Sequence, residues 1–408
     1  MTYRLGILLP YLNGYCLSLN PRIDFFLTTI NINMKQHSPQ KWSISLAPVV
    51  LFTLVVLAIS CQKNKTPLTS EEVVSAPFKQ PQQLKDFQQF NLVANNNEYG
   101  AVRVEPNLVN AWGIAFAPSG IAWVNSEATG LSFLYDKTGT PPRAPVAIPG
   151  PATPTGGHPT GIVFNGSSDF KLLNGNPARF IFVGVDGVLS GWNSGNFAER
   201  KANNSATSAY TGLAIGNDAG ANFLYAANFR TGNIDVFDKD YVQVFTKPFT
   251  DPNLPAGYSP FNIQNVGGKL YVMYAKVDPA TGEEDAHPGF GIVDIYNTNG
   301  ILDKRFTSNG QLNAPWGVAK APPGFFADED GMSDVILVGN FGDGHINAFN
   351  SDGRFLGQLR AHGQPVEIEG LWAISFAPTT ATTIDPNWLF FAAGPDDEQD
   401  GLFGYITK

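Results

Sequence analysis

The sequence predicts an all-β protein, a six-bladed β-propeller with four-stranded antiparallel blades. The first observation behind this prediction is a recurring phrase, written NAWGIAFAP at 110–118, NAPWGVAKAP at 313–322 and GLWAISFAP at 370–378. The second is that each copy opens a unit of about fifty residues with several short apolar runs, as propeller blades do.

Six such units follow one another along the chain. Their opening runs are WGIAF at 112–116, TGIVF at 160–164, TGLAI at 211–215, FNIQN at 261–265, WGVAK at 316–320 and WAISF at 372–376. Aligned residues at 113, 161, 212, 262, 317 and 373 give spacings of 48, 51, 50, 55 and 56 residues. We expect these runs to be the innermost strands, where small residues allow close approach around the axis.

The rest of each unit supplies the outer strands. A second run follows the first, as in RFIFVGV or NFLYAANF, and a third follows after a Gly or Asp turn, as in NIDVFD or GIVDIYN. A weaker fourth run, such as YVQVF or RFLGQL, closes several copies. Short β-branched and aromatic runs bounded by Gly, Asn and Asp are typical of strands.

The ring is expected to close through the N-terminal part of the domain. The sixth copy ends at its third run, GLFGYIT, and DFQQFNLVAN at 86–95 is a strand-like run that precedes the first copy. We predict that 86–95 supplies the missing outer strand of the sixth blade, which removes an open sheet edge. The propeller domain is therefore expected to span 85–408.

The N-terminal segment is typical of export. Lys35 and Lys41 precede an apolar stretch at 46–59, which is followed by Ser60 and Cys61. This pattern resembles a lipoprotein signal peptide at 34–61, with Cys61 as the lipidated residue, and the stretch is short for a membrane span. An ordinary signal peptide or an uncleaved anchor is the alternative. Residues 1–33 are interpreted as an upstream extension before a start at Met34, and 62–84 as a flexible tether.

Composition excludes several classes of function. The net charge is −9; residues 1–61 carry four basic residues and one acidic residue, so the remainder carries −12. An acidic domain argues against nucleic-acid binding through phosphate contacts. The two cysteines, Cys16 and Cys61, lie outside the predicted domain, which leaves no disulfide framework and no cysteine metal site there.

Several longer stretches carry a family resemblance. They are FTDPNLPAGYSPFNIQNVGGKLYVMYAK at 249–276, NAPWGVAKAP at 313–322, ILVGNFGDGHINAFN at 336–350 and FFAAGPDDEQDGLFGYI at 390–406. Residues 85–408 resemble an uncharacterised family of secreted bacterial proteins with six-bladed, NHL-like propellers. The resemblance implies the fold and export from a bacterial cell, and it implies no activity. Val185 departs from the pattern, since an acidic residue is common there in relatives.

The candidate ligand-binding residues follow the second strands, whose ends gather around one channel mouth in such a fold. They are Asn125, Glu127, Asp186, Asn228, Lys276, Asn340, Asp343, Asp396 and Asp397. Turn chemistry alone also explains Asn and Asp at such places. Lys276 is the cation of the set and could anchor an anionic ligand. The acidic insertion at 277–291 and the string at 396–400 could offer oxygen ligands to Ca²⁺, the one cofactor considered.

Two functions remain open at this stage. The sequence contains no G-x-S-x-G, HExxH or P-loop motif, and no catalytic residue is identified. This favours a lipid-anchored binding or interaction module of the cell envelope, monomeric, with an unknown protein or glycan partner. The alternative is a metal-dependent hydrolase, lactonase- or esterase-like, with its site at the channel mouth.

Overall fold

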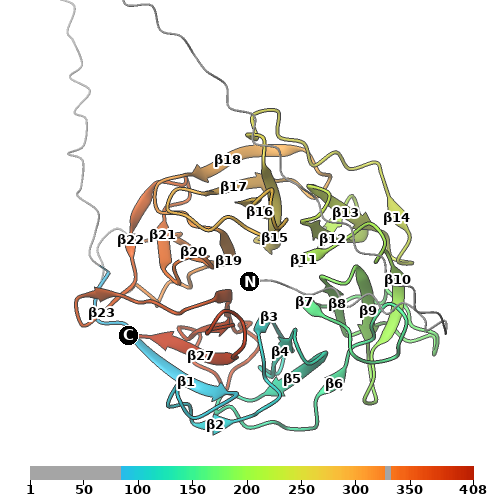
Figure 1. Ribbon diagram of the computed structural model, residues 1–408, viewed down its shortest axis with the longest axis horizontal. Helices are drawn as coiled ribbons and strands as arrows, with labels where there is room; N and C mark the ends of the chain where they lie inside the picture. Colours follow the sequence, from blue (N-terminus) through green and yellow to red (C-terminus); the bar gives the residue numbers. More distant parts are fainter. Residues whose placement is uncertain (1–83, 327–331) are drawn as a thin grey trace, which may run out of the picture. The chain divides into compact units, whose positions relative to one another are not determined.

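The computed structural model describes residues 84–326 and 332–408, and it confirms the predicted fold class. Six antiparallel β-sheets lie around a central axis as the blades of a propeller (Figure 1). Blades are numbered here by the order of their innermost strands. Among the residues described, no helix is long and apolar enough to cross a membrane.

The first three blades each contain four strands. Blade one consists of β3 (Ala111–Phe116), β4 (Ala122–Ser126), β5 (Leu131–Tyr135) and β6 (Val146–Ala147). Blade two consists of β7 (Pro159–Phe164), β8 (Phe180–Gly184), β9 (Val188–Trp192) and β10 (Glu199–Asn203). Blade three consists of β11 (Tyr210–Asp218), β12 (Ala221–Asn228), β13 (Asn233–Phe237) and β14 (Gln243–Val244).

Two further blades repeat this plan, and the sixth extends it. Blade four consists of β15 (Tyr258–Val266), β16 (Lys269–Lys276), β17 (Gly291–Tyr296) and β18 (Leu302–Ser308). Blade five consists of β19 (Pro315–Lys320), β20 (Ile336–Asn340), β21 (Ile346–Phe349) and β22 (Phe355–Gln358). Blade six consists of β25 (Leu371–Phe376), β26 (Leu389–Ala393), β27 (Leu402–Thr407), β1 (Gln88–Ala94) and β2 (Arg103–Val104). A separate hairpin pairs β23 (Arg360–Ala361) with β24 (Gln364–Pro365).

The predicted ring closure is confirmed. β1 pairs antiparallel with β27, from Gln88 opposite Thr407 to Ala94 opposite Leu402. β2 adds a short parallel strand outside β1, so the sixth sheet has five strands instead of the predicted four. The first and last strands of the domain therefore belong to one sheet. Because β1 covers the outer edge of β27, the backbone groups of β27 are paired on both sides.

The predictions for 1–33, for the signal at 34–61 with Cys61, and for most of the tether at 62–84 lie outside the described residues. Leu84 is the exception: it is fully buried and forms a β-bridge with Leu359. The folded domain therefore includes at least Leu84, one residue before the predicted boundary.

A β-bulge explains the recurring phrase. In all six blades, the pairing of the innermost strand with the second strand shifts register next to the opening of the repeat. The residues that the shift leaves unpaired include Trp112, Thr160, Thr211, Phe261, Trp316 and Trp372. A bulge redirects its side chain relative to the regular alternation of a strand, and here that side chain faces the axis.

In five of the six blades a small residue after the bulge lets neighbouring inner strands approach closely, whereas blade four has Asn262 at this position. A Cβ added to Gly113 would lie 2.2 Å from the carbonyl oxygen of Thr160 in the next blade. A Cβ added to Gly161 would lie 2.5 Å from the backbone nitrogen of Leu213. Such distances exclude a side chain unless the backbone moves, which supports the role predicted for these glycines.

We expect Gly161→Ala to lower the free energy of unfolding by about 1–3 kcal/mol, because the new methyl group meets backbone that cannot move without displacing blade three. Urea denaturation measures this change. Gly166→Ala is the matched control, because a Cβ at Gly166 meets only a ring carbon of Phe164 at 3.5 Å. Equal stability of the two variants would contradict the close-packing explanation.

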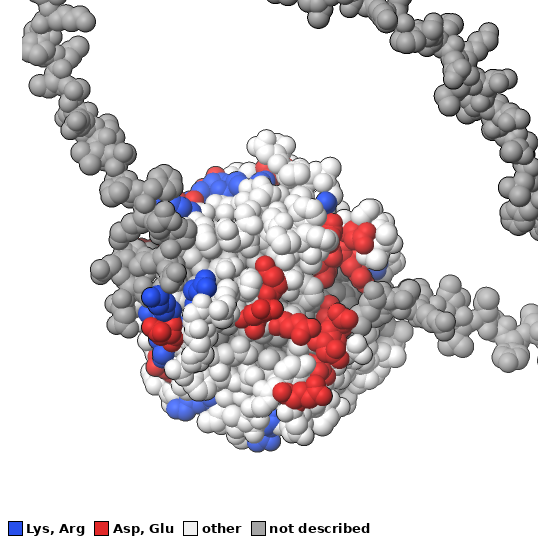
Figure 2. All heavy atoms as spheres, turned by 60° about the vertical axis from the view of Figure 1, so that its left-hand side comes forward, with Lys and Arg blue, Asp and Glu red and all other residues white. Residues whose placement is uncertain are grey.

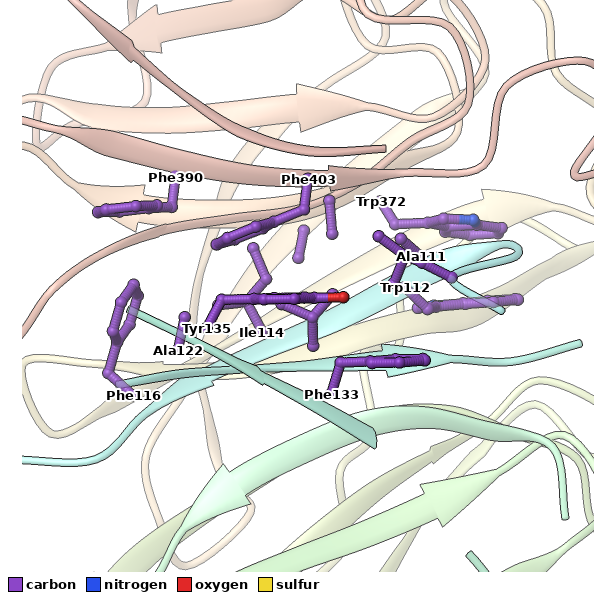
Figure 3. Packing of buried hydrophobic residues seen from close by; sticks show 14 of the residues in the cluster. Ala111, Trp112, Ile114, Phe116, Ala122, Phe133, Tyr135, Trp372, Phe390 and Phe403 are labelled. Atoms are coloured by element: carbon purple, nitrogen blue, oxygen red, sulfur yellow. The ribbon is translucent and has the colours of Figure 1, made fainter. Parts of the chain in front are cut away.

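The three tryptophans of the phrase fill the channel together. Trp112 stacks on Trp372 with ring centroids 3.5 Å apart, as Figure 3 shows, and Phe341 stacks on Trp372 at 4.0 Å. The indole of Trp316 in blade five donates to the carbonyl oxygen of Thr211 in blade three, a contact that skips a blade. The rings therefore meet around the axis of the propeller.

Candidate functional site

The predicted asparagines lie beneath the surface and hold loops together. Asn125 is fully buried and donates to the carbonyl oxygen of Thr160 across the blade seam at 2.9 Å. Asn228 donates to Ser208 and Asp235, and Asn340 donates to the carbonyl oxygen of Gln311 and to Asp343. Their amide nitrogens are therefore used by the fold, whereas the amide oxygens of Asn125 and Asn340 are buried without a hydrogen-bond partner.

Two of the predicted aspartates also accept backbone hydrogen bonds. Asp186 accepts from the backbone of Val188 and of His158, and burial raises its pKa. Asp343 accepts from the backbone of His345 and from Asn340. Burial alone would raise the pKa of Asp343, but these hydrogen bonds outweigh it and lower the pKa. Both carboxylates shape turns at the ends of second strands.

Lys276 does not offer a free positive charge. Its ammonium group lies 3.7 Å from the Asp285 carboxylate and 3.9 Å from the centre of the Phe290 ring. His287 also contacts Asp285, with Nδ1 2.6 Å from the carboxylate. Lys276 therefore fastens the base of the blade-four insertion at 277–291, and a role as anion anchor would require this contact to open.

The last predicted pair belongs to an unusual turn. Asp396 and Asp397 are exposed, and together with Glu398 they form three consecutive non-glycine residues with left-handed φ angles of 54°, 50° and 65°. The backbone nitrogen of Glu398 donates to Gly394, and that of Asp400 donates to Pro395. A left-handed conformation costs free energy at each of these non-glycine residues. The turn that they form directs the Glu398 side chain toward blade one, where it accepts from Asn110.

Asn110 joins the side chains that meet there. It is buried, and its Nδ2 donates to Glu127 of blade one at 3.1 Å and to Glu398 of blade six at 2.9 Å. Its Oδ1 accepts from the indole nitrogen of Trp372 at 2.8 Å. One amide therefore connects two carboxylates to the aromatic cluster in the channel beneath them.

His158 extends this group from blade two. Its Nδ1 lies 2.8 Å from Oε1 of Glu127, and about half of the imidazole side chain is exposed, at 48%. The hydrogen bond to Glu127 raises the pKa of His158 against the opposite effect of burial. A carboxylate that binds Nδ1 leaves Nε2 as the nitrogen available to a ligand.

A third carboxyl group comes from the blade-four insertion. Glu284 is partly buried and lies close enough to Glu398 for the two charges to repel. Burial, followed by the charges of Glu398 and Glu283, raises the pKa of Glu284 to about 8. Burial, followed by the charge of Glu127, raises the pKa of Glu398 to about 7. We call Asn110, Glu127, His158, Glu284 and Glu398 the acidic mouth.

Acidic side chains gather on one face of the propeller. Figure 2 shows Asp and Glu clustered around a hollow on this face, while most of the Lys and Arg lie toward its edge in that view. None of the ion pairs of the described residues joins Lys or Arg to Glu127, Glu284 or Glu398. Negative charge therefore accumulates at the mouth without a basic side chain to balance it.

The acidic mouth is expected to make stability depend on pH. The folded protein retains protons on Glu284 and Glu398 where the unfolded chain, with an ordinary pKa of 4.5, has released them. The stability from these two groups is therefore complete below pH 4.5 and is lost as pH rises through about 7 and 8. Glu398→Gln should raise the melting temperature at pH 8 and flatten its decline between pH 5 and 8. Glu98→Gln, which changes an exposed glutamate outside the acidic mouth, is the control, and an equal effect of both variants would contradict a special role for Glu398.

The structure shows no preformed metal centre in the part it describes. No group of three or more His, Cys, Asp or Glu side chains in residues 84–326 and 332–408 could hold a metal ion together. The oxygen-rich strings at 277–291 and 396–400 contribute Glu284 and Glu398 to the acidic mouth. Binding of Ca²⁺, which also takes carbonyl oxygens as ligands, stays a prediction.

Sequence reasoning placed Glu127, Asp396 and Asp397 near the mouth and missed Asn110 and Glu398 as members. The signal for Asn110 was present, because NA precedes the Trp-Gly step in the phrases at 110 and at 313. The signal for Glu398 was absent, because its direction depends on a left-handed turn of residues that seldom adopt one.

Comparisons with known proteins give relatives but no activity. No established family model matches the chain. The uncharacterized protein R648 of Acanthamoeba polyphaga mimivirus is 33% identical over 334 residues, which is 78% of this chain and 80% of the relative. The uncharacterized protein L690 of the same virus is 32% identical over 333 residues, covering 78% of this chain and 85% of the relative.

Among solved structures, the chain is similar to streptogramin B lyase, with a TM-score of 0.46, 12% identity, and coverage of 79% of this chain and 97% of that chain. It is also similar to a gluconolactonase from Xanthomonas campestris, with a TM-score of 0.43, 13% identity, and coverage of 73% and 87%. The expected bacterial and secreted origin stays a prediction, since these sequence relatives are viral. By its similarity to R648 and L690, the chain belongs to the same protein family as these two mimivirus proteins.

Proposed function

We propose that this protein is an exported, lipid-anchored propeller of the bacterial cell envelope whose acidic mouth binds a basic side chain of a protein partner. The observation that carries the proposal is the convergence of Glu127, Glu284 and Glu398 from blades one, four and six without a balancing Lys or Arg. Partly buried carboxylates are costly unless a cation or a proton accompanies them. A bound cation would replace the protons that Glu284 and Glu398 otherwise retain.

The arrangement favours an organic cation over a metal ion. An ammonium or guanidinium group donates several hydrogen bonds over a wider span than a single Ca²⁺ ion does. Phe341 is partly exposed and stacks on Trp372, whose indole is hydrogen-bonded to Asn110, and the face of an exposed aromatic ring attracts cations. Guanidinium suits the site best, because its fork can pair with one carboxylate while its plane stacks on a ring.

Binding is tested with small probes that carry only the cationic group. Nα-acetylarginine amide should raise the melting temperature of the wild-type domain at pH 7, whereas Nα-acetylcitrulline amide, its neutral counterpart, should not. Glu398→Gln and Glu127→Gln should each remove most of the shift, and Glu98→Gln, which changes an exposed glutamate outside the acidic mouth, should retain it. Stabilisation by neutral oligosaccharides that Glu398→Gln leaves unchanged would instead support a glycan partner. No response to any probe would reject the proposal.

The export part of the proposal is supported by Lys35, Lys41, the apolar stretch at 46–59 and Cys61. If Cys61 carries the lipid, Cys61→Ala should yield a protein that no longer sediments with membranes after cell lysis. Cys16→Ala is the matched control, since Cys16 lies before the predicted signal. Equal fractionation of wild-type and Cys61→Ala protein would exclude the lipid anchor.

A hydrogen bond favours a second candidate, a lactonase- or esterase-like hydrolase at the same mouth. Glu127 contacts Nδ1 of His158, the geometry by which a carboxylate orients a histidine general base. Glu398, with a pKa of about 7, could return a proton to the leaving group. Hydrolysis of phenyl acetate and of a γ-lactone, with and without added Ca²⁺, tests this. Wild-type activity that is lost in His158→Ala and in Glu127→Gln would support this candidate. Hydrolysis at the same rate by the wild-type protein and by both variants would exclude it.

A further inference from the structure

A pocket separate from the acidic mouth lies between blades three and four. Its volume is about 470 Å³. It is lined by Ala209, Phe229, Arg230, Thr231, Gly232, Gly257, Tyr258, Ser259, Val277, Thr281 and Gly282. It shares no residue with the acidic mouth. A pocket of this size is within the range that small organic ligands occupy.

The lining combines an apolar part with hydrogen-bond donors. Phe229 and Val277 supply the apolar part and pack against the aromatic cluster of the channel. Arg230 contributes an exposed guanidinium, which donates a hydrogen bond to the carbonyl oxygen of Ser205 at 3.3 Å. Thr231 and Thr281 contribute hydroxyl groups, of which Thr281 already accepts from the backbone nitrogen of Glu283. A ligand that complements this lining would therefore have an apolar body and one group that accepts hydrogen bonds.

The charge of the pocket is opposite to that of the mouth. Arg230 is the charged residue of the lining, which contains no Asp or Glu. Among the described residues, Arg230 forms no ion pair with a carboxylate. Acidic residues of the blade-four insertion flank the lining: the backbone nitrogen of Glu283 donates to Thr281, and burial followed by the charge of Asp285 raises the pKa of Tyr258. Asp285 is itself held by Lys276 and His287, which reduces its repulsion of an anion.

We propose that this pocket binds a small carboxylic acid, with its carboxylate on the guanidinium of Arg230 and its apolar body against Phe229 and Val277. Guanidinium pairs with carboxylate through two parallel hydrogen bonds, which is the strongest pairing available to an uncompensated arginine. An apolar body favours a carboxylate over inorganic phosphate, because phosphate would leave Phe229 and Val277 uncovered.

The test uses phenylacetate, hexanoate, acetate and inorganic phosphate as probes in isothermal titration calorimetry with the full chain. Phenylacetate and hexanoate should bind at least tenfold more tightly than acetate and phosphate, and the neutral phenylacetamide should not bind. Arg230→Gln should weaken phenylacetate binding at least tenfold, while Arg230→Lys should weaken it less because the charge is kept. Arg354→Gln, which removes an exposed arginine outside the pocket, should bind as the wild type does.

A melting curve shows that each variant is folded, and Glu398→Gln separates this site from the acidic mouth. Phenylacetate binding that survives in Glu398→Gln and is lost in Arg230→Gln supports the proposal. Equal binding by wild type and Arg230→Gln, equal affinity for phosphate and phenylacetate, or no binding of either apolar acid would overturn it.

Discussion

A chain that begins at Glu98 is expected to lose cooperative unfolding and to aggregate. It lacks β1, whose residues pair with β27 from Gln88 to Ala94 and close the sixth sheet. It also lacks Phe87, which is buried against Phe325 and Phe326. Without them, β27 becomes an exposed edge whose free backbone groups can pair with another chain. Circular dichroism during heating, with light scattering, measures both effects.

A chain that begins at Leu84 is the control for this truncation. It keeps β1 and the bridge between Leu84 and Leu359, so it should melt as sharply as the longer protein. If the chain that begins at Glu98 melts at the same temperature and with the same sharpness, β1 does not hold the ring closed.

Replacing Trp372 with alanine is expected to cause the largest loss of stability among single substitutions in the channel. Trp372 is 1% exposed and lies between the rings of Trp112 and Phe341. Removing a buried aromatic side chain of this kind costs about 3–5 kcal/mol, because the cavity that remains cannot be filled by its neighbours. Urea denaturation of Trp372→Ala at pH 7 measures the loss.

Two comparisons separate packing from hydrogen bonding in this result. Trp372→Phe keeps an aromatic ring between Trp112 and Phe341 but removes the donor to Asn110, so it should cost less than Trp372→Ala. Trp388→Ala removes an indole that is only partly buried and stacks on Tyr405. A loss in Trp388→Ala as large as in Trp372→Ala would contradict the special place of the channel cluster.

The fold could be predicted because its signals are local and repeated. Each inner strand carries its own apolar run and its own small residue, so six independent segments such as 112–116 and 160–164 indicate the same position in a blade. The closing strand could be predicted because the sixth copy of the repeat lacks a fourth apolar run, while the strand-like run at 86–95 belongs to no other copy. Hydrophobic patterns of this kind depend only on near neighbours in sequence.

The site could be predicted only in part, because its contacts join residues far apart in the chain. Asn110 and Glu398 are separated by 288 positions, and their contact depends on the left-handed turn at 396–398. The asparagines at 125, 228 and 340 looked equivalent to Glu127 in sequence, yet burial directs their amides into the fold. The repeat predicts the position of a residue in its blade, whereas the direction of its side chain depends on the packing of the folded domain.

The central claim is that the acidic mouth exchanges its protons for a bound cation. At pH 7, Glu284 and Glu398, with pKa values of about 8 and 7, retain protons that a cation would displace. Calorimetric titration with Nα-acetylarginine amide, which has no group that titrates near pH 7, in phosphate and in Tris buffer counts protons released on binding, because the two buffers take up protons with different heats. We predict net proton release by the wild-type protein and a smaller release by Glu398→Gln. Binding heats that do not differ between the buffers would contradict the claim.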